Sequence, residues 1–381
     1  MNRITHNNLR LRSWLEIDKK ALAHNYQSLR KILSPGCQLM AVAKSNAYGH
    51  SLIDYSQAMQ ALGVDWLGVD SIIEAVTLRK NNITVPILVL GYTFPELVAT
   101  AIKQNISLLI SSFDSLQELV ASGQATGLKI HLKFDTGMSR QGFSPDQAES
   151  VLQFMKDKLP SVIIEGVCTH LAGAKNPAFP ESAQQQLSGF EQVLKIFSQQ
   201  GLKVIRHASA TSGAIVFPES HYDLVRIGIG LYGLWPSPEV KQAFVDRLSL
   251  QPSLTWKTIV AEVKTLLANS KIGYDWTETV SQPTKIAVLP IGYWHGYDRS
   301  LSSKGCGVIK GQLAKVLGRV SMDMIVVDIS QIDDVKVGEE VILIGQQGLT
   351  SFSAEAMAEL AQTTNYEIVT RLNPLIKRIY K

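Results

Sequence analysis

Short apolar runs separated by longer amphipathic stretches organise the first two thirds of the chain. Eight such runs lie at residues 39–43, 66–69, 87–90, 107–110, 130–134, 163–168, 204–208 and 224–231. The stretches between them, such as 115–121, 146–158 and 181–200, carry apolar residues at helical spacing, as does 19–33. Eight strand-then-helix units in roughly 220 residues are typical of a closed parallel barrel. An open doubly wound sheet would need fewer strands and a G-x-G-x-x-G turn. The pattern therefore predicts a (β/α)8 TIM-like barrel over residues 19–247.

The pattern changes after about residue 248. Short β-branched runs at 253–267, 285–290, 306–309, 313–317, 324–329 and 340–344 alternate with turns that contain glycine. We expect one late helix at 353–362 and a last strand near 366–371. Residues 248–381 are therefore predicted to form a mainly β domain. An alternating run at 13–18 precedes the barrel, and we expect it to pair with the C-terminal sheet.

Composition and charge narrow the class of protein. The chain has 381 residues, of which 45% are hydrophobic and 18% charged, so it can build a sizeable core. The net charge of +4 and the lack of a basic stripe disfavour nucleic-acid binding. Cys37, Cys168 and Cys306 are too few and too scattered for a disulfide framework or a zinc site. The segment from Met1 to Arg12 is polar, and no run reaches 18 apolar residues. These features predict a cytoplasmic protein with no membrane span and no metal.

Polar side chains gather where the predicted barrel strands end. The ends of parallel barrel strands meet at one face, which is where such barrels place their active sites. The groups at these ends are Lys44 after the first run, Lys133, Asp135 and Arg140 at the fifth, His170 after the sixth, Thr211 and Ser212 after the seventh, and Arg226 with Gly228 at the eighth. The sequence therefore predicts one polar site at this face.

Lys44 follows a buried run directly, and two interpretations are open. Strands often end in a hydrated charge, and on spacing alone that is the commoner case. Alternatively, desolvation lowers the pKa of the amine, and the free amine forms a Schiff base with a carbonyl cofactor such as pyridoxal phosphate.

The loops after the seventh and eighth runs fit a phosphate site. They read Thr211-Ser212-Gly213 and Arg226-Ile227-Gly228-Ile229, and barrels often bind phosphate there through backbone N–H groups and hydroxyls. Small polar residues also cap helices and make turns, which is the alternative. Tyr48 would add a hydroxyl, unless it makes only a structural hydrogen bond.

Arg226 offers a cation that is always charged. Next to a pyridoxal ring nitrogen, an arginine cannot supply a proton as a carboxylic acid does, so the ring would stabilise a carbanion only weakly. Such a site suits a reaction that returns the proton at once. An ordinary ion pair with Asp223 or Glu219 is the alternative.

Several stretches resemble the alanine racemases. The run from Val42 to His50, V-A-K-S-N-A-Y-G-H, is similar to their pyridoxal-phosphate lysine motif, and residues 133–140 are similar to their K-x-D-T-G-M-x-R. The resemblance covers nearly the whole chain. It implies that Lys44 binds pyridoxal 5'-phosphate and acts as one base. It also implies that Tyr274, in I-G-Y-D, is the second base, supplied by the other subunit of a homodimer with shared active sites.

Further roles follow from the same resemblance. Lys133 would be carbamylated and hold Arg140, which would bind the substrate carboxylate. His170, in T-H-L-A, would hydrogen-bond Tyr274 in line with Arg226. Tyrosine has an unperturbed pKa of about 10, so it needs nearby positive charge to act as a base, and we expect it from His170 and Arg226.

The β domain carries the remaining matches. G-R-V-S-M-D at 318–323 resembles a segment that seats the substrate carboxylate through Met322, with Asp323 beside it. Tyr366 fits a tyrosine that contacts the phosphate, and Tyr293 fits one at the entry channel. Together with Tyr274 they imply a narrow mouth that favours small amino acids.

The chain also departs from the family pattern. Residues 294–298 replace the usual A-D-G-Y-P, Lys175 stands where an acid often lines the entrance, and Ala210-Thr211 replaces Asn-Ser. The resemblance implies interconversion of L- and D-alanine, with D-alanine supplied to peptidoglycan. A serine-preferring or broad-specificity racemase is the first alternative. A non-catalytic pyridoxal-phosphate carrier is the second. A decarboxylase is disfavoured, because such an enzyme would need an acidic residue at the ring nitrogen, where this chain has Arg226.

Overall fold

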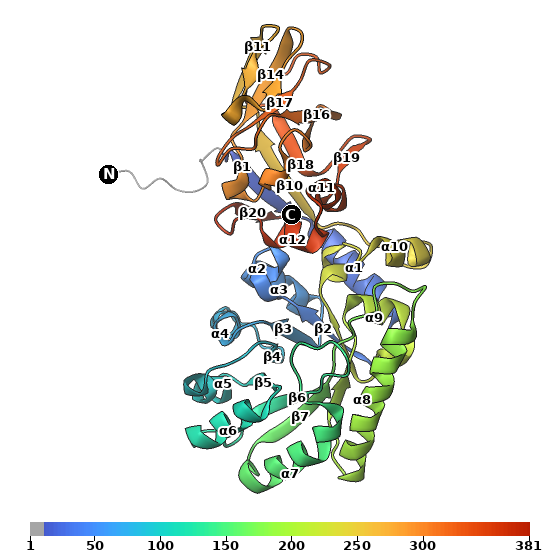
Figure 1. Ribbon diagram of the computed structural model, residues 1–381. Helices are drawn as coiled ribbons and strands as arrows, with labels where there is room; N and C mark the ends of the chain where they lie inside the picture. The colour runs from blue at the N-terminus through green and yellow to red at the C-terminus, as the bar shows by residue number, and fades with distance from the viewer. Residues whose placement is uncertain (1–10) are drawn as a thin grey trace, which may run out of the picture. The chain divides into compact units, whose positions relative to one another are not determined.

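The computed structural model describes residues 11–381, so most of the polar N-terminal segment lies outside the described residues. The described residues form two compact units, each coloured by position along the chain in Figure 1. The barrel unit comprises Lys20–Ala47 and Leu52–Gln251. The β unit comprises the described residues up to Lys19, together with Tyr48–Ser51 and Pro252–Lys381. Within the described part, no helix is both long and apolar enough to cross a membrane.

Eight parallel strands form the wall of the barrel unit. They are β2 (Gln38–Val42), β3 (Trp66–Val69), β4 (Ile87–Val89), β5 (Ile106–Ile110), β6 (Lys129–Lys133), β7 (Ile163–Cys168), β8 (Ile205–His207) and β9 (Leu224–Ile227). Each strand pairs with its neighbour in the order β8-β7-β6-β5-β4-β3-β2-β9. The backbone N–H of Arg226 donates to the Ser209 carbonyl (2.9 Å) and nearly closes the ring between β9 and β8. The predicted (β/α)8 barrel is confirmed.

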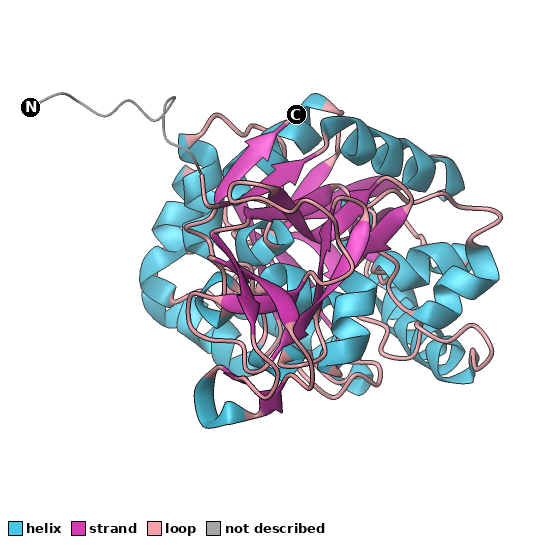
Figure 2. Cartoon of the chain, turned by 90° about the horizontal axis from the view of Figure 1, so that it is seen from above, coloured by secondary structure: helices cyan, strands magenta, loops and turns pink. Residues whose placement is uncertain are grey.

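Helices lie outside these strands, in cyan around the magenta strands in Figure 2. They are α1 (Lys19–Ile32), α3 (Leu52–Ala61), α4 (Ile72–Lys80), α5 (Val98–Lys103), α6 (Phe113–Ser122), α7 (Ala148–Lys158), α8 (Glu181–Gln199), α9 (Thr211–Val216) and α10 (Pro238–Phe244). Local signals set their ends: Ser71 and Glu74 form a capping box at the start of α4. Residues Leu187, Phe190 and Leu194 of α8 are buried at helical spacing, so one face of the helix packs on the barrel.

The predicted strand at 224–231 is too long. β9 ends at Ile227, and Ile229–Tyr232 forms a 3-10 turn after Gly228. Every residue of that turn is buried. Because the strand and the turn after it are both buried, the apolar run continues across the boundary, and periodicity gives no sign of where the strand ends.

The β unit is built on an antiparallel-rich sheet. Its strands are β1 (Ser13–Ile17), β10 (Leu254–Ile259), β11 (Glu262–Leu266), β14 (Thr284–Leu289), β15 (Cys306–Ile309), β16 (Gln312–Leu317), β17 (Ile325–Asp328), β18 (Glu340–Gln347), β19 (Thr350–Phe352) and β20 (Lys377–Tyr380). A separate pair, β12 (Lys271–Ile272) and β13 (Glu278–Thr279), flanks Tyr274. β1 pairs antiparallel with β10 and parallel with β20. The mainly β character of this part is as predicted.

The end of the chain differs from the prediction. Two late helices are present, α11 (Ala354–Ala361) and α12 (Asn365–Thr370), where one was expected. The segment near 366–371, predicted as the last strand, is helix α12, and the last strand is β20. Its β-branched residues suggested a strand, but the buried positions Asn365, Ile368 and Val369 follow helical spacing, so packing of one helical face overrides propensity.

Candidate active site

Lys44 lies at the carboxyl end of β2, as the sequence predicts. Its side chain is 40% exposed, and Nζ lies 3.6 Å from Asp70 Oδ1. The Lys44 ammonium group therefore lies beside a carboxylate and within reach of solvent. Asp70 follows β3 and was not singled out from the sequence.

The backbone after Lys44 forms a left-handed turn. Ser45, Asn46, Ala47 and Tyr48 all have φ between 50° and 56°. Each non-glycine residue in this conformation costs roughly 1–2 kcal/mol, so the turn is strained. Hydrogen bonds hold it: Ser45 N donates to Glu74 Oε1 (3.0 Å), and Leu52 N donates to Asn46 Oδ1 (2.9 Å). Such strain is commonly found at functional sites.

Replacing Gly49 with alanine should destabilise the protein. Gly49 has φ +84°, and an added Cβ would overlap the Val369 carbonyl oxygen. Gly36 has a similar φ, +80°, with open space around it, so Gly36→Ala is the matched control. We expect Gly49→Ala to lower the free energy of unfolding by at least about 2 kcal/mol more than Gly36→Ala, measured by urea denaturation. Equal losses in the two variants would contradict this packing.

Arg226 is the buried cation at the barrel mouth. Its guanidinium donates to the carbonyl oxygens of Thr169 and Ala208, both at 2.8 Å. It also donates to His207 Nδ1 (2.6 Å) and to His170 Nδ1 (3.2 Å). Asp223, the alternative ion-pair partner, instead binds Arg206 at 2.8 Å. Among the described residues no carboxylate contacts the Arg226 guanidinium, whose partners are two carbonyl oxygens and two imidazole nitrogens.

His170 is a neutral hydrogen-bond partner. Because Arg226 can only donate, His170 Nδ1 accepts and the ring proton lies on Nε2. Burial, reinforced by Arg226, lowers the pKa of His170 to about 3. The positive charge expected of His170 is therefore absent at neutral pH, while Arg226, Arg140, Lys133 and Lys44 place positive charge around this ring.

Lys133 and Arg140 lie on the two sides of one tight turn. Lys133 is buried, and burial, with Arg140 and Arg226 adding positive charge nearby, lowers its pKa to about 8. Asp135 accepts the backbone N–H groups of residues 137–140 at 2.7–3.0 Å. Burial alone would raise the pKa of Asp135, but these donors leave it below its usual value. The turn therefore fixes the backbone of Arg140 beside a lysine with a weakened affinity for its proton.

The loops after β8 and β9 meet through a hydroxyl. Thr211 Oγ1 accepts from the backbone N–H groups of Gly228 (3.2 Å) and Gly230 (3.4 Å). Thr211, Ser212 and Ile229 are buried. The predicted phosphate residues are thus neighbours in space at one end of the barrel.

The β unit holds the other predicted residues. Tyr274 is 69% exposed and lies between Gly273 (φ +68°) and Asp275 (φ +59°). Asp275 Oδ2 lies 2.8 Å from Arg319 Nε, which ties this loop to residues 318–323. The same segment contacts Tyr293, whose N–H donates to the Ser321 carbonyl (3.0 Å).

Met322, Asp323 and the altered residues 294–295 are neighbours. Trp294 N donates to the Met322 carbonyl (3.1 Å), and His295 Nδ1 lies 3.9 Å from Asp323 Oδ1. Also in the β unit, the rings of Tyr48 and Tyr366 lie 6.2 Å apart between centroids. The predicted site residues thus form two groups, one in each unit.

The sequence did not point to three residues that connect Arg226 to the interior of the barrel unit. His207 contacts the guanidinium directly, and His131 and Glu165 follow behind it. The available signal was a histidine within each of two apolar strand runs, β6 and β8, which is more often a core residue than a functional one.

Comparison with known proteins identifies the family. Residues 17–236 match the family described as "Alanine racemase, N-terminal domain", and residues 253–380 match "Alanine racemase, C-terminal domain". A protein of Desulforamulus reducens named alanine racemase is 39% identical over 370 residues, covering 96% of this chain and 98% of that protein. One of Methanococcus maripaludis with the same name is 37% identical over 370 residues, covering 96% and 98%.

Solved structures agree. The structure titled alanine racemase from Bacillus anthracis with bound L-Ala-P has a TM-score of 0.92 at 30% identity, covering 98% of this chain and 96% of that one. The alanine racemase of Streptomyces lavendulae has a TM-score of 0.91 at 32% identity, with 98% of each chain covered. The chain therefore belongs to the alanine racemase family, whose members are isomerases.

Proposed function

We propose that the protein is a pyridoxal 5'-phosphate-dependent racemase that interconverts L- and D-alanine with two bases, Lys44 and Tyr274. The observation that most supports this is the buried guanidinium of Arg226, which has no carboxylate among its contacts in the described part of the chain. A permanent cation there suits a cofactor ring whose nitrogen is only an acceptor.

The side chains of the barrel unit fit this cofactor. Lys44 offers an amine for the aldehyde of the cofactor, and Arg226 offers a hydrogen-bond donor for its ring nitrogen. The loops that contain Thr211 and Gly228 offer hydroxyl and N–H groups for its phosphate. Ser212 and Ile229 of the same unit are also proposed to bind the cofactor, with His170 beside Arg226. The β unit is proposed to contribute Tyr48 and Tyr366. Bound pyridoxal phosphate supplies an electron-withdrawing ring that stabilises negative charge at the substrate Cα.

The protein's own groups then handle the proton. Lys44 takes or returns it on one face of Cα, and Tyr274 on the other. Tyr274 needs positive charge nearby, which Arg226 supplies through the neutral His170. Arg140 and Met322 hold the substrate carboxylate, and Tyr293 narrows the entrance. Asp323, next to Met322 in the chain, would support this segment, and its Oδ1 lies 3.9 Å from His295 Nδ1.

Tyr274 is exposed together with Trp276, Trp294 and Met322 in the β unit. Of these, Trp294 donates its backbone N–H to the Met322 carbonyl, and neighbouring exposed apolar side chains are typical of an interaction site. We propose that a second copy of this chain covers them and that the homodimer shares its active sites. The product D-alanine would serve peptidoglycan synthesis in the cytoplasm.

Absorption and mass spectrometry test the cofactor assignment. The purified protein should be yellow, release pyridoxal phosphate on denaturation and, after borohydride reduction, carry the cofactor on the peptide that contains Lys44. A colourless protein that stays colourless with added pyridoxal phosphate would refute the assignment. Turnover of alanine, serine and lysine then separates an alanine racemase from the serine-preferring or broad alternative suggested by Lys175 and Trp294.

Bicarbonate should activate the enzyme through Lys133. Because burial lowers the pKa of Lys133 to about 8, more of it is free amine near neutral pH than for an ordinary lysine, and the proposed carbamate forms more readily. The carbamate would hold Arg140 by charge. We expect added bicarbonate to lower the KM for alanine in CO2-depleted enzyme, and to have no effect on Lys133→Arg. An equal response in that variant would contradict carbamylation.

A further inference from the structure

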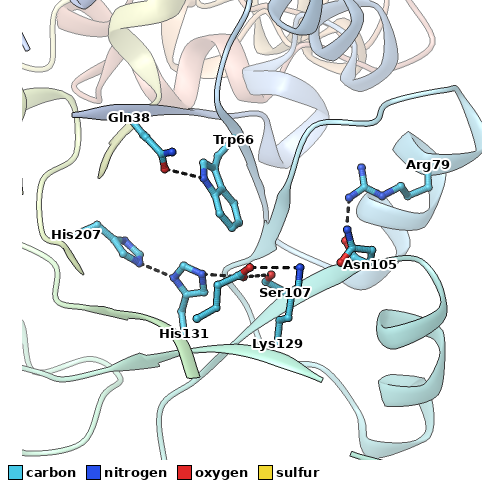
Figure 3. Close-up of polar contacts among 9 residues, drawn as sticks. Gln38, Trp66, Arg79, Asn105, Ser107, Lys129, His131 and His207 are labelled. Atoms are coloured by element: carbon cyan, nitrogen blue, oxygen red, sulfur yellow. Dashed lines mark hydrogen bonds and ion pairs between the residues drawn. The ribbon is translucent and has the colours of Figure 1, made fainter. Parts of the chain in front are cut away.

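A chain of buried polar side chains runs through the barrel unit behind Arg226. His131 Nδ1 lies 2.8 Å from His207 Nε2, and both rings are fully buried. On the far side, His131 Nε2 lies 3.4 Å from Glu165 Oε2. Figure 3 draws the contact between His207 and His131, and the contacts of His131, Ser107 and Lys129 with the carboxylate between them, which is that of Glu165. Side chains from four strands, β9, β8, β6 and β7, thus connect Arg226 to one carboxylate.

The protons in this chain have one allowed arrangement. A guanidinium only donates, so His207 Nδ1, 2.6 Å from Arg226, must accept. His207 then carries its proton on Nε2 and donates to His131 Nδ1. His131 in turn carries its proton on Nε2 and donates to Glu165. Both imidazoles are neutral in this arrangement, and every hydrogen bond points from Arg226 toward Glu165.

Two features of the backbone make room for these contacts. Along β6 and β7, Ile130 pairs with Ile164, but His131 pairs with Gly166, so Glu165 is an extra residue in the ladder. Such a bulge redirects a side chain, and it is rare between parallel strands. At Gly166 an added Cβ would overlap His131 Nδ1. The bulge presents Glu165 to His131, and the missing side chain at Gly166 leaves space for the ring.

Glu165 is the first carboxylate reached from Arg226 along this chain of hydrogen bonds. A buried cation without a counter-charge is costly. Burial raises the pKa of Glu165, but hydrogen bonds from His131 and Ser107 and the nearby Lys129 leave it lowered, so the carboxylate is ionised at neutral pH. Burial and the charge of Arg226 lower the pKa of His207, which keeps that ring neutral.

We propose that Glu165, His131 and His207 form a one-directional hydrogen-bond relay that supplies the counter-charge of Arg226 and fixes its guanidinium in one orientation. They are positioning residues. The relay polarises Arg226 toward His207, so the other N–H groups of Arg226 donate more weakly at the barrel mouth. The relay itself does not depend on the proposed function. Only one part does, namely that the cofactor ring accepts the remaining hydrogen bonds of Arg226.

Two substitutions at Glu165 separate charge from shape. Glu165→Gln keeps the length and the acceptor oxygen but removes the charge, whereas Glu165→Asp keeps the charge and shortens the side chain. In the holoenzyme we expect Glu165→Gln to lower kcat roughly tenfold, with little change in KM, and to shift the visible band of bound pyridoxal phosphate. Glu165→Asp should retain more activity and an unshifted band. Glu191→Gln, which alters a carboxylate bound to Tyr222, is the control.

The opposite order, with Glu165→Gln closer to the unchanged protein than Glu165→Asp, would overturn the relay because only shape would then matter. Nitrogen-15 NMR of the unsubstituted holoenzyme provides a second test that needs no activity. His131 and His207, assigned by comparison with His131→Gln and His207→Gln, should each show one protonated Nε2 and one bare Nδ1 between pH 6 and 9. A doubly protonated ring, or a proton on Nδ1, would overturn the proposal. If these tautomers are found in a protein that does not racemise alanine, the proposed function fails and the relay stands.

Discussion

Replacing Lys44 with alanine should reduce racemisation by about four orders of magnitude or more. Lys44 is proposed both to hold the cofactor and to move a proton on one face of Cα, and loss of such a group removes both contributions. Lys44 lies at the end of β2 and is followed by four consecutive left-handed residues. We therefore expect no other lysine to take its place. The measurement is D-alanine formed from L-alanine at saturating pyridoxal phosphate.

Lys103→Ala is the matched control, because Lys103 is an exposed lysine at the end of α5 in the same unit. It should leave the rate unchanged. Methylamine added to Lys44→Ala should restore part of the activity by replacing the missing amine. Activity of Lys44→Ala within tenfold of the unchanged enzyme would contradict the role given to this residue.

Replacing Tyr274 with phenylalanine should remove one of the two bases and leave the cofactor bound. General-base catalysis contributes about 10²–10⁴-fold, so we expect a loss in that range. Because each base serves one face of Cα, exchange of the Cα hydrogen with deuterated water should persist for one enantiomer and be lost for the other. A non-catalytic carrier of pyridoxal phosphate would bind the cofactor unchanged and show no exchange with either protein.

Tyr222→Phe is the control for this change, because Tyr222 donates its hydroxyl to Glu191 in the barrel unit and has no proposed role at the site. Its rates should match the unchanged enzyme. If Tyr274→Phe slowed exchange equally for both enantiomers, this would contradict the claim that each base acts on one face of Cα.

The hydrophobic pattern was sufficient to predict the barrel because parallel strands are buried on both faces. Each strand therefore reads as a continuous apolar run, and eight runs with helical stretches between them leave few alternatives. The same burial hides the end of β9, where the apolar run continues into a 3-10 turn. At α12, β-branched residues gave a strand pattern, while the burial of Ile368 and Val369 within the β unit favoured a helix.

The candidate site was predictable to the extent that its residues lie at strand ends. Arg226, His170 and Thr211 are where the barrel pattern placed them, and their contacts follow from that position. His131, His207 and Glu165 could not be found in this way. They lie within strands, and the bulge that turns Glu165 toward His131 depends on the register between β6 and β7, which no local pattern encodes.

The most direct test of the central claim is the optical rotation of L-alanine incubated with the purified protein and pyridoxal phosphate. We predict that the rotation falls to zero as D-alanine accumulates to an equal amount, because the two enantiomers have the same free energy. An unchanged rotation over many hours, or loss of L-alanine without D-alanine, would contradict the claim.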